Sequence, residues 1–317
     1  MKRIKIFLCA AAFLVAATAH AQTPETVDTS WKQGGFTSLS FTQVSLSNWA
    51  AGGEEAYSGV VMINLFSNYA KDKTVWDNSL DLGYGLIKSG EAKAHKNEDK
   101  IELNSKYGYK AFGNFFYSGL VNFRSQFTAG YNYPDDSTVV SKFAAPAYLI
   151  VALGLDYKPN EFFSVFISPA TGKYTLATDQ KLADAGAYGV DPAVYDALGN
   201  KTADGKTLRS EFGAYFRAKF QKDLATNFNL STTLALFDNY TDKDADNKTN
   251  VDVNWETMLT MKAGKLFTVS LATNLIYDHN IKLPTYETIN GVKTPTGASG
   301  PKTQFKEVFG IGISYKF

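Results

Sequence analysis

Cysteine is almost absent from this chain of 317 residues, which contains one, Cys9. After the first 21 residues, no apolar run is long enough to span a membrane as a helix. A surplus of charge of either sign is also missing, because 32 basic residues stand against 31 acidic ones. This balance argues against a nucleic-acid partner, which normally requires a strongly basic surface.

The first 21 residues have the pattern of a secretory signal peptide. Residues 2–5 are mostly basic, 6–17 are apolar, and the Ala-His-Ala sequence at 19–21 fits a small-x-small cleavage site. An uncleaved anchor helix is the alternative, but an apolar stretch of about twelve residues is short for a membrane span. Cleavage would remove the single cysteine, which excludes disulfides, cysteine-ligated zinc and cysteine nucleophiles from the mature protein.

Most of the remaining sequence alternates between apolar and polar residues. In residues 100–111, Ile101, Leu103, Tyr107 and Tyr109 alternate with polar, charged or glycine residues. Because successive side chains of a strand point to opposite faces, such a segment has one apolar and one polar face. Many of these segments are long enough to cross a bilayer as tilted strands. The predicted strands are twelve in number, at 36–47, 57–69, 73–87, 100–112, 115–130, 147–157, 162–168, 209–222, 227–240, 249–262, 266–279 and 303–317.

Short and long connections alternate between these strands. Short turns such as 70–72 and 113–114 are each followed by a longer connection, of which 169–208 is the longest. In outer-membrane barrels the short turns lie on the periplasmic side and the longer loops lie outside, and aromatic belts mark the two interfaces. A soluble β-sandwich also alternates, but it gives no reason for this separation of connections.

The predicted fold class is therefore all-β: a transmembrane, antiparallel, up-and-down β-barrel of 12 strands with short periplasmic turns and long extracellular loops. The expected divisions are a signal peptide at 1–21, a periplasmic segment at 22–35 and the barrel at 36–317. The 169–208 connection is too long for a plain connector, and we expect an ordered loop that folds over or into the mouth of the barrel.

The C-terminus supports the same prediction. Phe309, Ile311, Ile313 and Tyr315 alternate with other residues down to a terminal Phe317. This pattern resembles the closing-strand signature of bacterial outer-membrane proteins, which the barrel-assembly machinery recognises. The resemblance implies a location in a Gram-negative outer membrane, reached through the cleaved signal peptide, with membrane lipid and the assembly machinery as partners.

Three segments together resemble a known family. They are 43–53, the Ser-Pro-Ala-Thr-Gly-Lys segment at 168–173, and 185–191. The first contains an Asn-Trp-x-x-Gly-Gly pattern made by Asn48, Trp49, Gly52 and Gly53. The family consists of Gram-negative outer-membrane barrel proteins that are defined only as a domain of unknown function. The resemblance implies the location and the barrel, and it implies no activity.

Enzymatic chemistry has little support in the sequence. His95 and His279 are the histidines outside the signal segment. Outer-membrane phospholipases place a His/Ser pair on a twelve-stranded barrel, but no serine can be placed beside His279. The acidic run 242–247 resembles the start of a calcium loop, but it lacks the glycine at the sixth position, and Val253 stands where a glutamate is required. We predict no catalytic residue, metal or cofactor.

The polar strand faces give a stronger indication. When they are projected inward, they line a lumen with charges of both signs, which require partners or water. The candidates for a constriction are Arg124, Arg217, Glu102, Asp81, Glu256 and Lys106. Rings of charge set selectivity in pores, and mixed signs predict weak selectivity. The sequence thus predicts a narrow channel or binding site for small polar solutes. Structural salt bridges, in a non-conducting barrel that scaffolds or assists other envelope proteins, are the alternative.

Overall fold

The computed structural model describes residues 29–45, 54–133, 135–242, 247, 250–264, 267–289 and 292–317. The predicted signal peptide lies outside these residues. Trp31–Phe317 form one compact unit. Within the described ranges, no helix has both the length and the apolar character that a membrane crossing requires.

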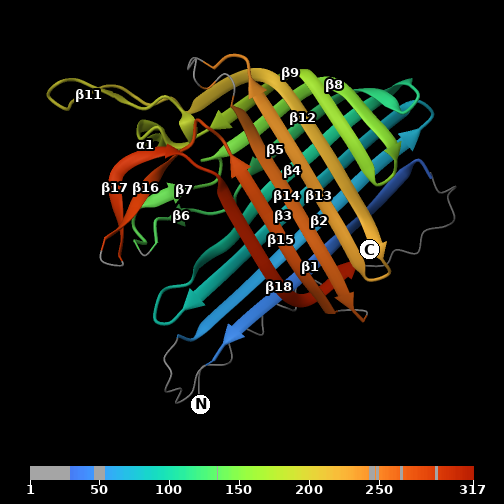
Figure 1. Ribbon diagram of the computed structural model, residues 1–317, viewed down its shortest axis with the longest axis horizontal. Helices are drawn as coiled ribbons and strands as arrows, with labels where there is room; N and C mark the ends of the chain where they lie inside the picture. The colour runs from blue at the N-terminus through green and yellow to red at the C-terminus, as the bar shows by residue number, and fades with distance from the viewer. Residues whose placement is uncertain are drawn as a thin grey trace, which may run out of the picture. The chain divides into compact units, whose positions relative to one another are not determined.

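Twelve antiparallel strands close into a barrel, in which the strands follow one another around the wall in chain order and the last pairs with the first (Figure 1). The wall strands are β1 (Trp31–Val44), β2 (Ala56–Lys71), β3 (Thr74–Ser89), β4 (His95–Phe112), β5 (Phe115–Ser125), β8 (Ala147–Asn160), β9 (Phe163–Leu176), β12 (Leu208–Ala225), β13 (Phe228–Asn239), β14 (Val251–Ala263), β15 (Phe267–Tyr277) and β18 (Gln304–Lys316). The prediction of a twelve-stranded up-and-down barrel is confirmed.

The long connections carry their own secondary structure, gathered at one end of the barrel (Figure 1). Three small hairpins lie there, namely β6 (Gly130–Tyr131) with β7 (Val139–Ser141), β10 (Val194–Tyr195) with β11 (Lys201–Ala203), and β16 (Lys282–Ile289) with β17 (Val292–Pro301). A short helix α1 (Gln180–Asp184) and a 3₁₀ turn η1 (Ala187–Gly189) lie in the connection after β9. The sequence pattern predicted none of these hairpins, because the strands of the first two have only two or three residues and those of the third, which contain prolines, lack a regular apolar–polar alternation.

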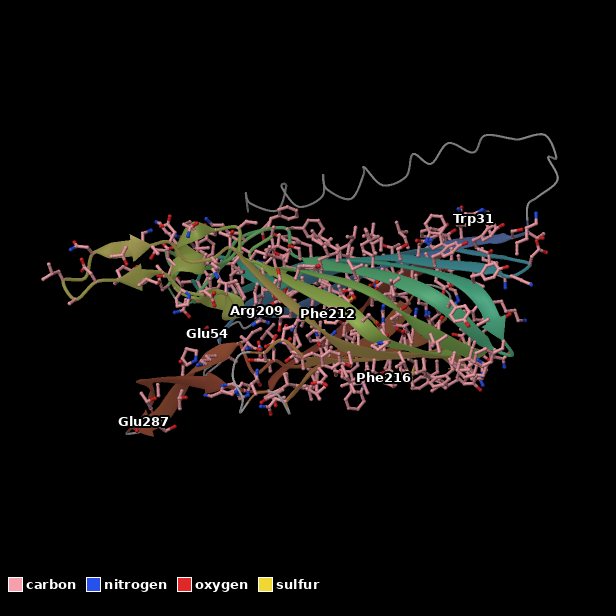
Figure 2. All side chains as sticks on the ribbon, turned by 90° about the horizontal axis from the view of Figure 1, so that it is seen from above. Trp31, Glu54, Arg209, Phe212, Phe216 and Glu287 are labelled. Carbon is pink, nitrogen blue, oxygen red and sulfur yellow. The ribbon has the colours of Figure 1, made fainter. Side chains whose placement is uncertain are left out.

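The outer face of the wall is apolar. Phe41, Leu153, Phe267 and Phe309 are each more than half exposed, and Figure 2 shows Phe216 pointing away from the wall. Apolar side chains gain by leaving water, so a continuous exposed surface of this kind requires an apolar surrounding. The barrel thus presents to its exterior the surface that a bilayer solvates.

Aromatic side chains gather near both ends of the wall. At the short-turn end, the Trp31 ring lies 5.1 Å from that of Tyr69 and 6.1 Å from that of Trp76. At the loop end, Phe212 lies 6.3 Å from Tyr240 in an edge-on arrangement. Figure 2 shows Trp31 at the opposite end of the barrel from Arg209. The two belts match the interfacial girdles expected at the two surfaces of a membrane.

The predicted end of the seventh strand at residue 168 is wrong, because β9 continues through Pro169 to Leu176. Leu153 pairs with Ala170 and Leu155 with Ile167, so Ser168 and Pro169 of β9 stand opposite the single residue Gly154 and form a bulge. The buried Ser168 hydroxyl donates to Leu153 O (2.7 Å) and accepts from Ala170 N (3.2 Å). The extra residue of a bulge makes no hydrogen bond to the neighbouring strand. A proline, which has no N–H to donate, is therefore tolerated there. The long connection is therefore 177–207.

The wall also begins earlier than expected, at Trp31 instead of residue 36. Gly35 exchanges two backbone hydrogen bonds with Phe317, of 3.0 and 3.1 Å, which joins the start of β1 to the end of the chain. A Cβ on Gly35 would lie 2.5 Å from the Phe317 ring, so glycine permits this close approach. The glycines also remove the apolar–polar alternation from which the strand could have been recognised.

Candidate functional site

Four charged side chains meet in the middle of the lumen, and we call them the central ion network: Lys100, Glu102, Arg124 and Glu256. The Lys100 ammonium lies 2.8 Å from carboxylate oxygens of both Glu102 and Glu256. Arg124 Nη2 lies 2.8 Å from Glu256 Oε1. Glu256 stands on β14, six positions from β4 in the twelve-strand order, so these ion pairs cross the lumen between opposite walls.

Amides extend the central ion network to a further arginine. Arg217 on β12 donates to Asn104 Oδ1 at 2.6 Å. Asn122 donates to the same oxygen at 2.7 Å and also contacts Glu102 Oε1 at 2.9 Å. Both carboxylates and the Asn104 amide oxygen accept from a cation or an N–H, which holds the side chains in one geometry.

The structure brings together four of the six residues predicted for a constriction. Arg124, Glu102 and Glu256 belong to the central ion network, and Arg217 joins it through Asn104. Asp81 instead accepts a hydrogen bond of 2.6 Å from Asn64 on the neighbouring strand. Lys106 lies further towards the short turns, because its position on β4 is six residues beyond Lys100.

Lys106 belongs to a second cluster, nearer the short turns. Its ammonium lies 2.8 Å from the fully buried carboxylate of Asp156. Lys158 lies 3.7 Å from the same carboxylate and also pairs with Asp77 on β3. Both acids therefore have cationic partners; Asp156 is fully buried among them, whereas Asp77 keeps 37% of its side-chain surface exposed.

A third cluster lies at the loop end around Lys173, and we call it the mouth cluster. Lys173 Nζ lies 2.5 Å from Asp252, 3.1 Å from Asp278 and 3.6 Å from Glu211. Arg209 adds a second cation, at 2.9 Å from Glu211 and 3.3 Å from Asp278. Burial acts to raise the pKa of the Asp278 carboxyl, but Lys173 and Arg209 outweigh it and hold that pKa below its usual range.

The sequence indicated Glu211 and Asp252 as inward-facing, but it missed Lys173. The reason is the assumption that the strand ended at Ser168. Beyond the bulge the odd-numbered residues of β9 face the lumen instead of the even-numbered ones. Thr171, Lys173 and Thr175 are therefore all buried on the inner face. The alternation of these three residues with Gly172 and Tyr174 was the signal that could have revealed the continuation.

Part of the interior is packed rather than polar. Leu120, Ala152, Phe166, Tyr215 and Phe237 form a buried apolar cluster on the inner faces of β5, β8, β9, β12 and β13. The sequence reading assigned only polar faces to the lumen. These side chains fill part of the bore, beside inward-facing polar residues of the same strands such as Asp156 and Arg217.

The 177–207 connection is ordered and contacts the mouth cluster. Arg209 Nη1 donates to Gly189 O at 3.5 Å, and the Tyr188 hydroxyl donates to Val140 O in the β6–β7 hairpin. Ala183 and Val190 bury their side chains against Tyr188. Residues 177–190 therefore pack at the mouth of the barrel, whereas the β10–β11 hairpin later in the connection projects away from it, with Leu198 87% exposed (Figure 1).

Other predicted candidates do not form a site among the residues that the structure describes. The pattern residues Asn48, Trp49, Gly52 and Gly53 lie outside the described ranges, as do residues 243–246 of the acidic run. The Nδ1 atom of His279 lies 3.2 Å from the hydroxyl of Tyr277. In the described ranges, no group of three or more His, Cys, Asp or Glu residues could hold a metal ion.

Comparisons with solved structures find outer-membrane barrels at low sequence identity. An outer membrane channel (COG4313) from Pseudomonas putida F1 is 12% identical with a TM-score of 0.37, covering 90% of this chain and 94% of that one. The NanC porin is 9% identical with a TM-score of 0.36, covering 90% and 100%. The translocator domain of the autotransporter NalP from Neisseria meningitidis is 11% identical with a TM-score of 0.34, covering 90% and 87%.

No curated protein matches the sequence significantly. A family model described as "Protein of unknown function (DUF3078)" matches residues 41–131, which run from the end of β1 through β6. Over these residues the chain matches a family of unknown function, and the predicted resemblance to such a family is confirmed.

Proposed function

We propose that this protein is an outer-membrane channel that passes small polar solutes through a lumen constricted by the central ion network. The closed barrel, the apolar exterior and the two aromatic belts support the membrane location. The short turns then face the periplasm and the hairpin-bearing loops face the outside.

The observation that carries the proposal is the hydration of the central ion network. Lys100 keeps 32% of its side-chain surface exposed, and Arg124 and Glu256 keep 24% each. The second cluster also has exposed members, since Asp77 is 37% exposed, but its residues come from the nearby strands β3, β4 and β8. The central ion network combines exposed charges with partners on opposite walls, so these cross-lumen charges are the natural contact for a passing solute.

The charges also limit the class of solute. Three cations, Lys100, Arg124 and Arg217, face two carboxylates, Glu102 and Glu256, across the bore. A ring of both signs repels neither cations nor anions strongly, and it offers donors and acceptors to neutral or zwitterionic solutes. The packed apolar cluster fills part of the bore, which favours small solutes.

A non-conducting scaffold is the second candidate, and the cross-lumen pairing itself favours it. Because Glu256 bridges Lys100 and Arg124, the same ion pairs that would select a solute also hold opposite walls together. In that case the ordered loops at the mouth would be the functional surface.

Single-channel recording in planar bilayers tests the proposal. We expect stable open steps of small conductance, with cation and anion permeabilities within about fivefold of each other, since the ring has mixed signs. The variant Lys73→Gln, in an exposed turn, serves as the control and should behave like the wild type. Persistent silence of protein that migrates as a folded barrel on unheated gels would reject the channel and support the scaffold.

A further inference from the structure

The barrel wall is incomplete along one seam. The pairing of β1 with β18 contains five residue pairs, from Phe36–Lys316 to Ser40–Gly312. By comparison, β1 forms fourteen pairs with β2, and β18 forms ten with β15. Beyond Ser40, residues 41–44 and 304–311 are described in full, yet they pair only with the strands on their other sides.

A pocket of about 230 Å³ lies at this seam. Its inner lining includes Ser40, Thr42 and Ser270, whereas Glu307 and Phe309 of β18 also line it from the outer face. Glu307 and Phe309 face outward, because they pair with Thr273 and Leu271 on the lipid-facing side of β15. They also lie two and four residues from the exposed Phe305, and alternate residues of a strand share a face. Residues from both faces of the wall therefore line this pocket.

The lining of the pocket is more polar than the outer surface around it. Residues with hydroxyl, amide, ammonium and carboxylate groups line it, among them Thr42, Ser58, Asn97, Lys306 and Glu307. Its flanks on the exterior are apolar, since Phe41 and Phe309 are 58% and 60% exposed. Backbone groups that face hydrocarbon without a partner are costly, so the seam requires polar partners at this depth.

We propose that this seam is a lateral binding site between lumen and bilayer for a single-chain amphiphile with a compact anionic head. A volume of 230 Å³ accepts a carboxylate-sized head with a few waters, since a water occupies about 30 Å³. It does not accept an alkyl chain as well. The chain then lies outside, along Phe41 and Phe309, where the surface is already apolar.

Lys306 supplies the attraction for the head. It is the cationic side chain in the lining, and its ammonium lies 2.7 Å from a carboxylate oxygen of Glu98. The Lys306 side chain is 47% exposed, whereas that of Glu98 is 8% exposed, so the ammonium is the accessible member of the pair. An anionic head would bind to Lys306 in competition with Glu98 and against repulsion from Glu307 on the outer face, so neutralising Glu98 should strengthen binding.

Photo-crosslinking in nanodiscs tests the site. The probe is a fatty acid that carries a diazirine on its alkyl chain, and the comparison compound has the same alkyl chain with a cationic trimethylammonium head. We expect the fatty acid to label peptides containing 41–44 and 305–310 in preference to the rest of the exterior. Lys306→Gln should reduce this labelling about tenfold, the loss typical of a hydrogen bond to a charged group. Glu98→Gln should increase it. Lys316→Gln, at the other end of the same face of β18, should leave it unchanged.

Two outcomes would overturn the site. One is labelling spread evenly over the apolar exterior, which means ordinary contact with bilayer lipid. The other is equal labelling by the two head groups, unaffected by Lys306→Gln. If the β1–β18 pairing continued beyond Ser40–Gly312, Thr42 would stand opposite Gly310. A disulfide in the double variant Thr42→Cys/Gly310→Cys would therefore close the seam, and its oxidation should abolish labelling there. None of these readouts depends on ion conduction, so the site and the channel can fail separately.

Discussion

Replacing Glu256 with alanine is expected to raise the single-channel conductance and to shift permeability towards anions. Glu256 is the carboxylate that joins Lys100 and Arg124 across the bore. Its removal widens the passage and leaves the three cations facing Glu102 alone. A unit charge about 4 Å away contributes about 1 kcal/mol in water and more where water is scarce, which corresponds to a permeability ratio changed about fivefold or more. Reversal potentials under a salt gradient measure the shift.

A second substitution at the same position separates charge from size. Glu256→Gln keeps the volume and removes the charge, so it should reproduce the shift towards anions with a smaller gain in conductance. Lys73→Gln, in an exposed turn, should change neither quantity. If both Glu256 variants conduct as the wild type does, with unaltered selectivity, the central ion network is not the constriction.

Replacing Lys173 with methionine is expected to destabilise the barrel by about 3–5 kcal/mol, the typical cost of removing one partner from a buried ion cluster. Lys173 is surrounded by Asp252, Asp278 and Glu211, which would be left with Arg209 as their nearest cation. Urea unfolding in lipid vesicles at pH 7 measures the loss. Lys173→Arg, which keeps the charge, should recover most of it.

The pH dependence of this loss has a definite sign. In the folded wild type the pKa of Asp278 lies below its usual value. The stability that Asp278 contributes is therefore complete above an unfolded pKa of about 4 and is lost as the pH falls through the folded value. Lowering the pH from 7 towards 4 protonates Asp278 more readily in Lys173→Met, which has lost one of the two cations beside that carboxyl, so the deficit of the variant relative to the wild type should shrink. A deficit that stays constant would mean that Lys173 acts through packing alone.

The twofold periodicity of the sequence was enough to predict the number and order of the wall strands. Strand alternation is a local property, and residues such as Phe212 and Glu211 reveal their faces without knowledge of any partner. Local patterns failed where the backbone departs from a regular strand. At Ser168–Thr171 a bulge shifts the parity, and at Gly34–Gly35 there are no side chains to alternate.

The sequence predicted which charged residues line the candidate site, but not which of them form ion pairs with one another. Alternation identified Glu102, Arg124 and Glu256 as inward-facing. Which of them meet depends on the stagger between strands, since Glu256 comes from the wall opposite Lys100. The seam and the mouth cluster depend on the same long-range register, and the apolar cluster depends on large residues that occupy inner positions. None of these has a signature within one strand.

A spin-label scan of residues 212–220 in lipid vesicles tests the central claim most directly. Single cysteines can be placed there because Cys9, the one cysteine of the chain, lies in the predicted signal peptide. Labels at 212, 214, 216, 218 and 220 should be accessible to oxygen dissolved in the bilayer, whereas those at 217 and 219 should be accessible to a water-soluble nickel reagent. Labels at 212 and 216 that neither reagent reaches would place Phe212 and Phe216 in a packed core and contradict a membrane-spanning barrel.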